Sequence, residues 1–182
     1  MRAFCLVGVR GSGKTAMVRA VLPKVPQFAY VSTDTVLRSL VGPRYEEFDL
    51  FPDVIKKQFR SRAIMYLKEE SARSHRQLIV EDHASLYNPN TRRIERVLPE
   101  EASFFYTDLI LHQVDPRTVL ARRREKRMDR RYLDLDEIKK EVATEEAEAR
   151  RFADSGGLDL HVIPDSGGLE GAMRLLRILQ GY

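Results

Sequence analysis

The chain of 182 residues is long enough for one domain with a substantial buried core, and its 43% hydrophobic and 32% charged residues are typical of a soluble globular protein. A single cysteine, Cys5, excludes a framework of intramolecular disulfides. No apolar run approaches the roughly 20 residues of a membrane span, and the first strand leaves no room for a signal peptide, so we expect a cytoplasmic protein with no membrane partner. The net charge of +4 favours a small anionic ligand over a nucleic-acid coat.

The first strand and helix enclose a glycine-rich loop. An apolar run at 3–7 predicts a strand, residues 16–22 are compatible with a helix, and Gly8-Val9-Arg10-Gly11-Ser12-Gly13-Lys14-Thr15 lies between them. Its spacing, G-x-x-x-x-G-K-T, is that of a phosphate-binding loop whose backbone N–H groups surround phosphate oxygens. Lys14 would reach the β- and γ-phosphates, Thr15 would offer its hydroxyl to Mg²⁺, and the helix dipole would favour the anion. The residues expected to contact ATP are Gly8, Arg10, Gly11, Ser12, Gly13, Lys14, Thr15 and Ala16.

The next part of the chain predicts a second strand and two helices. Residues 28–31 predict the strand, and Thr33 or Asp34 is expected to cap a short helix that ends near residue 42. Residues 45–52 have no clear period and predict a loop or mobile flap. Apolar residues then recur at helical spacing over 53–73. The polar face of this long helix carries four basic side chains, Lys56, Lys57, Arg60 and Arg62.

Strands and helices continue to alternate in the second half. Strands are predicted at 78–80, 109–114 and 160–163, and helices at 92–98, 134–152 and 169–179. Another helix begins at Asp115-Pro116, with Asp as its cap and Pro as its first residue. Asn88-Pro89-Asn90 predicts a turn. This alternation indicates an α/β fold, with a parallel sheet covered by helices on both faces and right-handed crossovers.

Three polar residues, Glu81, Asp82 and His83, directly follow the strand at 78–80. A buried parallel strand that ends on polar residues commonly delivers a site to the carboxyl edge of the sheet. A carboxylate there would hold Mg²⁺, and strand alternation favours only one of the two. Strand length alone would allow either Glu81 or Asp82 to share the metal with Thr15, and His83 is on the same strand face as Glu81. The alternatives are a structural histidine and a solvated acidic turn.

A basic cluster follows Asp115-Pro116. Its members are Arg122, Arg123, Arg124, Lys126, Arg127, Arg130 and Arg131. Guanidinium groups match phosphate oxygens bidentately, so a mobile segment of this kind could close over two phosphorylated substrates and exclude water. Phosphoryl transfer needs such charge neutralisation more than it needs a base. The alternatives are a solvated helix face and an RNA-binding patch.

The glycine-rich loop, the polar residues after the strand at 78–80 and the basic cluster together resemble the motifs of the nucleoside monophosphate kinases, most closely those of the archaeal-type adenylate kinases. The loop is similar to their G-x-P-G-x-G-K-[ST], with Arg10 at the usual proline, and Glu81-Asp82-His83-Ala84 is similar to their Asp-x-His-Ala. This match aligns Glu81 with the family's aspartate, so we expect Glu81 to share Mg²⁺ with Thr15. Arg122 and Arg131 fall at lid-arginine positions, whereas Glu125 stands where a basic residue is expected. The segment from Ser32 to Arg38 is similar to the Ser-Thr-Gly-Asp-x-Leu-Arg of the broader adenylate kinases, with Asp34-Thr35 in place of Gly-Asp.

The resemblance implies a three-layer P-loop NTPase fold with a five-stranded parallel sheet in the order 2-3-1-4-5. It implies one domain over 1–182, with a monophosphate-binding flap at about 32–75 and an arginine-rich lid at about 122–136. Mg·ATP would be the donor, AMP the acceptor and ADP the product, and a homotrimer is one expected assembly. The implied catalytic residues are Lys14, Arg122, Arg127 and Arg131, and the implied acceptor-site residues are Thr33 at adenine, Arg38 at the α-phosphate, Glu81 and His83.

Two other functions are compatible with the sequence. The same loop and lid serve kinases of other nucleotides and of small hydroxylated metabolites. From another class, an ATP-dependent RNA-binding protein would use residues 122–131 on a phosphate backbone, and its binding would weaken steeply with salt. The sequence has no Asn-Lys-x-Asp motif, which argues against a GTP switch.

Overall fold

A parallel sheet of five strands forms the centre of the molecule, in the order β2-β3-β1-β6-β7. The computed structural model describes residues 2–88, 90–128, 133–165 and 168–181. The strands are β1 (Ala3–Val7), β2 (Phe28–Ser32), β3 (Gln77–Glu81), β6 (Asp108–Gln113) and β7 (Asp159–Pro164). Counted within this sheet the order is 2-3-1-4-5, so the predicted topology is confirmed.

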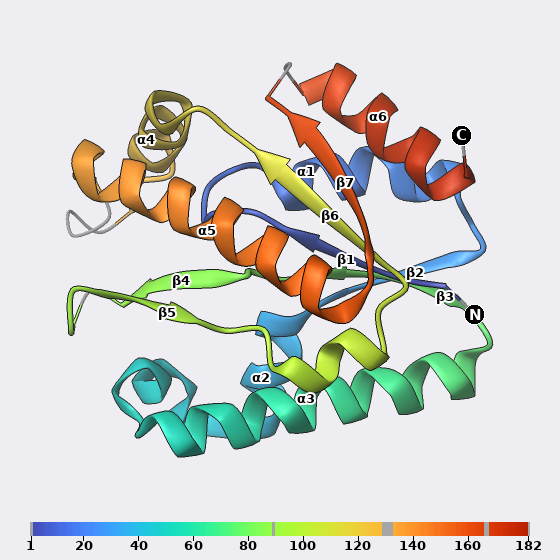
Figure 1. Ribbon diagram of the computed structural model, residues 1–182, viewed down its shortest axis with the longest axis horizontal. Coiled ribbons are helices and arrows are strands. Elements are labelled where there is room, and N and C mark those ends of the chain that lie inside the picture. Colours follow the sequence, from blue (N-terminus) through green and yellow to red (C-terminus); the bar gives the residue numbers. More distant parts are fainter. Residues whose placement is uncertain (1, 89, 129–132, 166–167, 182) are drawn as a thin grey trace.

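Helices cover both faces of the sheet and complete three layers (Figure 1). One face carries α1 (Lys14–Val21) and α6 (Gly168–Gln180), and the other carries α2 (Thr33–Val41), α3 (Asp53–Ser74) and α5 (Leu135–Gly156). Helix α4 (Pro116–Glu125) packs against α5. Strand β1 is buried on both faces: Cys5 packs toward α3 and α5, whereas Phe4 and Leu6 pack toward α1 and α6. Cys5 is therefore a buried structural thiol.

Local signals set several helix ends as the sequence predicts. The carboxylate of Asp115 accepts hydrogen bonds from two backbone N–H groups in the first turn of α4, and Asp134 does the same for α5. Gly157 ends α5 in the left-handed conformation, with φ 63°. The long helix predicted at 53–73 is α3.

The helix predicted at 92–98 is wrong. Strands β4 (Ser85–Asn88) and β5 (Arg93–Arg96) form an antiparallel hairpin outside the main sheet. Tertiary contacts explain the extended conformation, because the Glu95 carboxylate accepts hydrogen bonds from Asn88 Nδ2 at 2.9 Å and from Lys56 Nζ at 2.7 Å. Lys56 is consequently buried, although its helical position predicted an exposed side chain.

The segment predicted as a loop at 45–52 is mostly the 3₁₀ helix η2 (Gly42–Leu50). Phe48 anchors it, since its ring is buried and packs edge-on against Phe51 and Phe59. The cap of α2 also differs from the prediction: Ser32 occupies the N-cap position, without a side-chain cap hydrogen bond. A second 3₁₀ helix, η3 (Glu100–Phe104), leads into β6.

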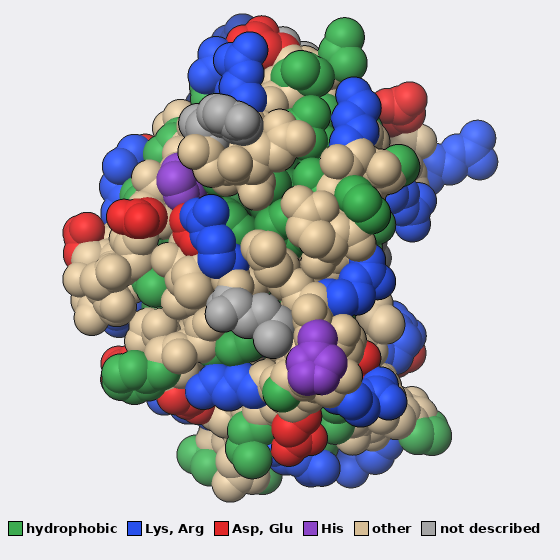
Figure 2. Space-filling model, turned by 90° about the vertical axis from the view of Figure 1, so that its right-hand side faces the viewer, with side chains coloured by type: hydrophobic (Ala, Val, Ile, Leu, Met, Phe, Trp, Pro, Cys, Tyr) green, Lys and Arg blue, Asp and Glu red, His purple; other side chains and the backbone are tan. Residues whose placement is uncertain are grey.

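Figure 2 shows the end of the molecule where the strands begin. Basic and acidic side chains are interspersed on this face, and hydrophobic side chains form small separate groups. Asp108, the buried first residue of β6, pairs with Arg2 at 2.8 Å and with His161 at 3.0 Å. Among the described residues, no helix has both the length and the apolar composition needed to cross a membrane.

Candidate active site

The phosphate-binding loop connects the carboxyl end of β1 to the first residue of α1. Gly13 is the N-cap of α1 and has φ 103°, a left-handed value that a residue with a side chain rarely adopts. At Gly8 the constraint is close approach, because a Cβ would lie 2.8 Å from the carbonyl oxygen of His112. Both positions therefore require glycine for the loop to keep its shape.

Two side chains of the loop fit a phosphate group. Lys14 is buried, and its Nζ donates hydrogen bonds to the carbonyl oxygens of Gly8 at 2.5 Å and Val9 at 3.4 Å. Burial lowers the pKa of Lys14, while the Glu145 carboxylate acts against that shift. Ser12 Oγ is buried and has no hydrogen-bond partner within the described residues. A bound phosphate would supply acceptors for both groups.

Glu81 lies directly beside the loop. Its Oε1 accepts a hydrogen bond from Thr15 Oγ1 at 2.9 Å, and its Oε2 accepts one from the hydroxyl of Tyr30. The two residues predicted to share a metal are thus in contact. Their carboxylate and hydroxyl oxygens are the hard ligands that Mg²⁺ prefers.

Asp82 belongs to the same edge but has different partners. One carboxylate oxygen accepts a hydrogen bond from Thr33 Oγ1 at 2.8 Å, and the other accepts from the backbone N–H of His83 at 2.8 Å. Burial raises the pKa of Asp82 to about 6. Strand β3 ends at Glu81, so strand alternation does not extend to Asp82, and both carboxylates line the same cavity. Only Glu81 of the two is hydrogen-bonded to Thr15.

His83 lines this cavity as a neutral imidazole. Burial lowers its pKa well below the ordinary value, and the nearby charges of Lys14 and Arg10 disfavour the cation further. Its Nδ1 is buried without a hydrogen-bond partner among the described residues. The ring lines the cavity and is not a cation at neutral pH, and its contact with a substrate stays a prediction.

The cavity has a volume of about 470 Å³ and opens between the loop, β3, α2, η2 and α3. Its charged lining includes Arg10, Arg38, Arg60, Asp34, Glu81 and Asp82. Thr33, predicted at the acceptor base, also lines it, but its hydroxyl is bound to Asp82. We call this space the acceptor cavity.

Arg38 lies at the rim of the acceptor cavity and is engaged by the neighbouring η2 helix. Its Nη1 contacts Glu46 Oε1 at 2.6 Å, its guanidinium lies over the ring of Tyr45 at 4.4 Å, and 55% of its side chain is exposed. The Tyr45 hydroxyl in turn donates to Asp34. An anionic acceptor would have to displace Glu46 to reach Arg38.

Arg60 is the cavity residue that the sequence analysis missed. It is partly buried, its guanidinium lies 5.9 Å from the centre of the Phe48 ring, and within the described residues it donates no hydrogen bond. Burial lowers its pKa, which means that the surroundings disfavour the cation. Helical periodicity placed Arg60 on a basic face but gave no signal to separate it from its neighbours.

A second cavity, of about 410 Å³, meets the loop at Ser12, Gly13 and Ala16. Arg122 lines it, donates to the carbonyl oxygen of Ser12, and pairs with Asp165 at 3.2 Å. Arg122 is therefore next to the phosphate-binding loop, where a lid arginine was predicted. We call this space the donor cavity.

The other arginines of the basic cluster differ in their surroundings. Arg123 is fully buried in an ion pair with Glu141, so it is neither solvated nor open to a substrate. The Arg127 side chain is exposed and makes no hydrogen bond or ion pair with the described residues. Arg131 lies outside the described residues. The catalytic roles of Arg127 and Arg131 remain predictions.

The fold and loop together define a P-loop protein with the architecture of the P-loop kinases. A shikimate kinase from Acinetobacter baumannii in complex with shikimate superimposes with a TM-score of 0.65 and 12% identity, covering 100% of this chain and 94% of that chain. A shikimate kinase from Aquifex aeolicus superimposes with a TM-score of 0.59 and 16% identity, covering 98% of this chain and 96% of that chain. A gluconokinase from Sinorhizobium meliloti superimposes with a TM-score of 0.55 and 14% identity, covering 99% of this chain and 96% of that chain. These low identities establish a shared fold.

The chain belongs to a family described as an AAA domain, because the model of that family matches residues 7–140. No curated protein matches the chain. None of the three structures named above is an adenylate kinase, so the resemblance to adenylate kinases remains a proposal about specificity.

Proposed function

We propose that the protein transfers the γ-phosphate of ATP to a small acceptor that carries an anionic group, and that this acceptor is AMP or a related nucleoside monophosphate. Arg60 is the observation that carries the proposal. A partly buried guanidinium without a hydrogen-bond partner in the described chain is unfavourable, and an acceptor phosphate would supply that partner. Arg10 and Arg38 add positive charge to the same cavity.

The donor side is supported by the loop and by the second cavity. Lys14 and the loop amides would hold the β- and γ-phosphates, and the donor cavity beside Ala16 and Arg122 would take the nucleoside. Thr15 and Glu81 would hold Mg²⁺, which neutralises charge on the phosphate oxygens when it is bound. No metal-binding cluster of three His, Cys, Asp or Glu side chains occurs in the described ranges, so phosphate and water would complete the coordination.

Glu81→Gln is expected to lower turnover at limiting Mg²⁺ by about tenfold and to recover part of it when Mg²⁺ is raised, because the amide is a weaker ligand than the carboxylate. A Mg²⁺ titration of turnover measures this effect. Asp82→Asn is the matched control, since Asp82 does not contact Thr15. A larger Mg²⁺ dependence in Asp82→Asn than in Glu81→Gln would move the metal role to Asp82.

A hydroxylated metabolite is the second candidate acceptor, and Asp82 favours it. A phosphate acceptor is already ionised at neutral pH, whereas a hydroxyl group must lose its proton during transfer. Asp82 is a carboxylate with a raised pKa in the acceptor cavity, which suits a proton acceptor. The two candidates thus differ in whether they need Asp82.

Asp82→Asn separates the two candidates. With a hydroxylated acceptor, kcat should fall about 100-fold or more, and the wild-type rate should decline as pH drops through about 6, because protonated Asp82 cannot accept a proton. With a monophosphate acceptor, Asp82→Asn should keep most of kcat, and a decline of the rate near pH 6 should be the same in wild type and variant, because the acceptor phosphate itself takes up a proton at about pH 6. The pH dependence of kcat for wild type and variant gives the answer.

RNA binding has less support from the basic cluster. Arg123 is buried, and Arg122 is bound to the phosphate loop and to Asp165, so neither projects freely toward an RNA backbone. A coupled assay of ADP formation, with ATP and a panel of nucleoside monophosphates and hydroxylated acids, tests the proposed function. Monophosphate-dependent turnover that is insensitive to moderate salt supports it, and salt-sensitive RNA binding without turnover on any acceptor would contradict it.

A further inference from the structure

Three glutamates on one face of α5 are buried: Glu141, Glu145 and Glu148. Their spacing of four and three residues places them side by side along the helix. A buried carboxylate is costly unless it is hydrogen-bonded or paired, so each of the three needs partners. Two of them find these partners at the active site.

Glu145 contacts two separate segments of the chain. Its Oε1 accepts hydrogen bonds from the backbone N–H groups of Gly8 at 2.8 Å and Ala84 at 2.9 Å. Its Oε2 accepts from the N–H of Ser85 at 2.6 Å and from Ser85 Oγ at 2.9 Å. Gly8 begins the phosphate-binding loop, and Ala84 follows the cavity residues Asp82 and His83. One carboxylate therefore joins the donor side to the acceptor side.

Strand pairing does not make this connection. The register of β1 and β3 ends at Leu6 and Glu81, and the Asp82 N–H donates to the Leu6 carbonyl at 3.0 Å as the chains leave the sheet. Beyond this point β1 continues into the loop, and β3 continues toward the hairpin. Glu145 bridges the two segments just after they separate.

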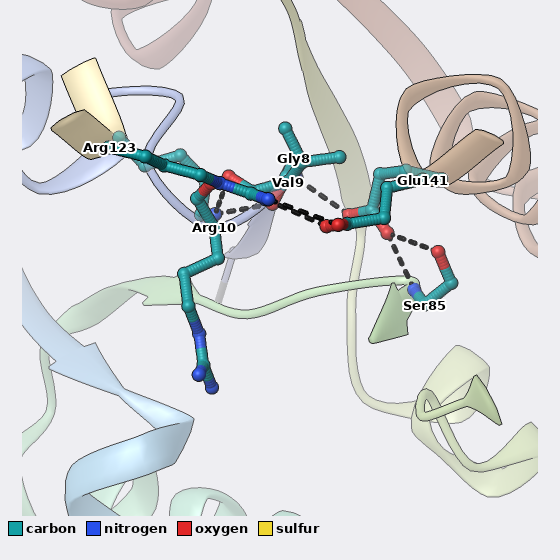
Figure 3. A network of polar contacts seen from close by, with 8 residues as sticks. Gly8, Val9, Arg10, Ser85, Arg123 and Glu141 are labelled. Carbon is teal, nitrogen blue, oxygen red and sulfur yellow. Dashed lines mark hydrogen bonds and ion pairs between the residues drawn. The ribbon is translucent and has the colours of Figure 1, made fainter. Parts of the chain in front are cut away.

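Glu141 supports the other part of the loop through Arg123. Arg123 Nη1 and Nη2 pair with the Glu141 carboxylate at 3.0 and 2.7 Å, and its Nε donates to the Arg10 carbonyl at 2.9 Å. Figure 3 shows this network, with Gly8 and Ser85 close to the same helix. Helix α5 thus contacts the loop directly at Gly8 and, through Arg123 of α4, supports it at Arg10.

We propose that Glu145 is a positioning residue that sets the placement of the phosphate-binding loop relative to the acceptor cavity, an inference that rests on the proposed phosphoryl transfer. Transfer requires the donor phosphorus and the acceptor oxygen to be held in a narrow range of distance and angle, and small displacements cost large factors in rate. Each substrate alone binds mainly to one side. Loss of Glu145 should therefore impair turnover more than binding.

Glu145→Gln tests the inference. The glutamine keeps one acceptor oxygen, and its NH₂ group takes the place of the other, so either the Gly8 and Ala84 donors or the Ser85 donors lose their acceptor. Glu148→Gln is the matched control. Glu148 is on the same buried face of α5, but its partners are Arg96 at 2.8 Å and Arg151 at 2.7 Å, away from the loop. Glu145→Asp is a second variant that keeps the charge and shortens the reach, for use if the amide variant does not fold.

For Glu145→Gln we expect kcat to fall about thirtyfold and the dissociation constants of Mg·ATP and of the acceptor to change less than about threefold. Glu148→Gln should keep kcat within about twofold of wild type. Backbone amide hydrogen exchange of Gly8 and Ala84, measured by NMR, should accelerate about tenfold or more in Glu145→Gln and Glu145→Asp, and not in Glu148→Gln.

Equal kcat losses in the Glu145 and Glu148 variants would show a general contribution to stability and would overturn the positioning role. Unchanged amide exchange at Gly8 and Ala84 would overturn it as well. Failure of the wild-type protein to transfer phosphate to any acceptor would refute the proposed function. Amide hydrogen exchange of the Mg·ATP complex would still decide whether Glu145 holds the Gly8 and Ala84 segments together.

Discussion

Replacing Lys14 with alanine is expected to lower kcat by about 100- to 1,000-fold, the largest effect predicted for a single side chain of this protein. The Lys14 ammonium lies inside the phosphate-binding loop, and its hydrogen bonds within the described part of the chain are to the carbonyl oxygens of Gly8 and Val9. It is therefore available to phosphate oxygens as negative charge develops on them. Steady-state kinetics with saturating ATP and acceptor measure the loss.

Lys14→Met is the control for side-chain volume, because Lys14 is buried and alanine would leave space as well as remove charge. Both variants should bind Mg·ATP more weakly and lose turnover to a similar extent. Circular dichroism should show native secondary structure in both. A folded variant with nearly normal turnover would contradict the kinase assignment.

Arg60→Ala is expected to raise KM for the acceptor by about thirtyfold while KM for ATP changes little, because loss of a charge-assisted phosphate contact costs about 2 kcal/mol. Arg60 lines the acceptor cavity from α3, beside the Phe48 ring, and no residue in the described chain accepts a hydrogen bond from it. Arg38→Ala should have a smaller effect, because Arg38 is exposed and already paired with Glu46.

Arg62→Ala is the matched control for Arg60. Arg62 lies two residues further along the same helix, is exposed, and rests over the ring of Phe59 at 5.6 Å, outside the acceptor cavity. Its loss should leave both KM values unchanged. Equal increases in KM for ATP and for the acceptor in Arg60→Ala would show that Arg60 does not bind the acceptor.

Local sequence signals were sufficient to predict the sheet and the donor loop. The glycine positions, Lys14 and Thr15 are adjacent in sequence, and backbone geometry alone dictates their roles. The carboxyl ends of neighbouring parallel strands meet at one edge, which placed Glu81 or Asp82 beside Thr15. The family resemblance selected Glu81, and Glu81 and Thr15 are in contact. The strand order also came from the resemblance, because the alternation of strands and helices predicts a parallel sheet without fixing its order.

The acceptor site could not be assembled from local signals because its residues depend on how separate elements pack. Arg60 is one of four basic residues on α3, and only the packing of α3 against the sheet selects it for the cavity while Lys56 pairs with Glu95. Arg38 lines the cavity, but its pairing with Glu46 depends on η2, whose sequence has no clear period.

Glu145 was missed for a similar reason. In the sequence it is one glutamate among many in a charged helix, and polar residues on a helix normally face solvent. Its carboxylate is buried because it accepts hydrogen bonds from three backbone N–H groups beyond the ends of β1 and β3, those of Gly8, Ala84 and Ser85. The need of these backbone groups for an acceptor cannot be seen in the pattern of polar and apolar residues.

A structure with a bisubstrate analogue, two adenosines joined by five phosphates, tests the central claim most directly. We predict that one adenosine occupies the donor cavity beside Ala16 and Arg122, that the phosphate chain passes Lys14, and that the far phosphate contacts Arg60. A second adenosine that lies outside the acceptor cavity, with Arg60 still unbound, would contradict the proposed transfer to a monophosphate.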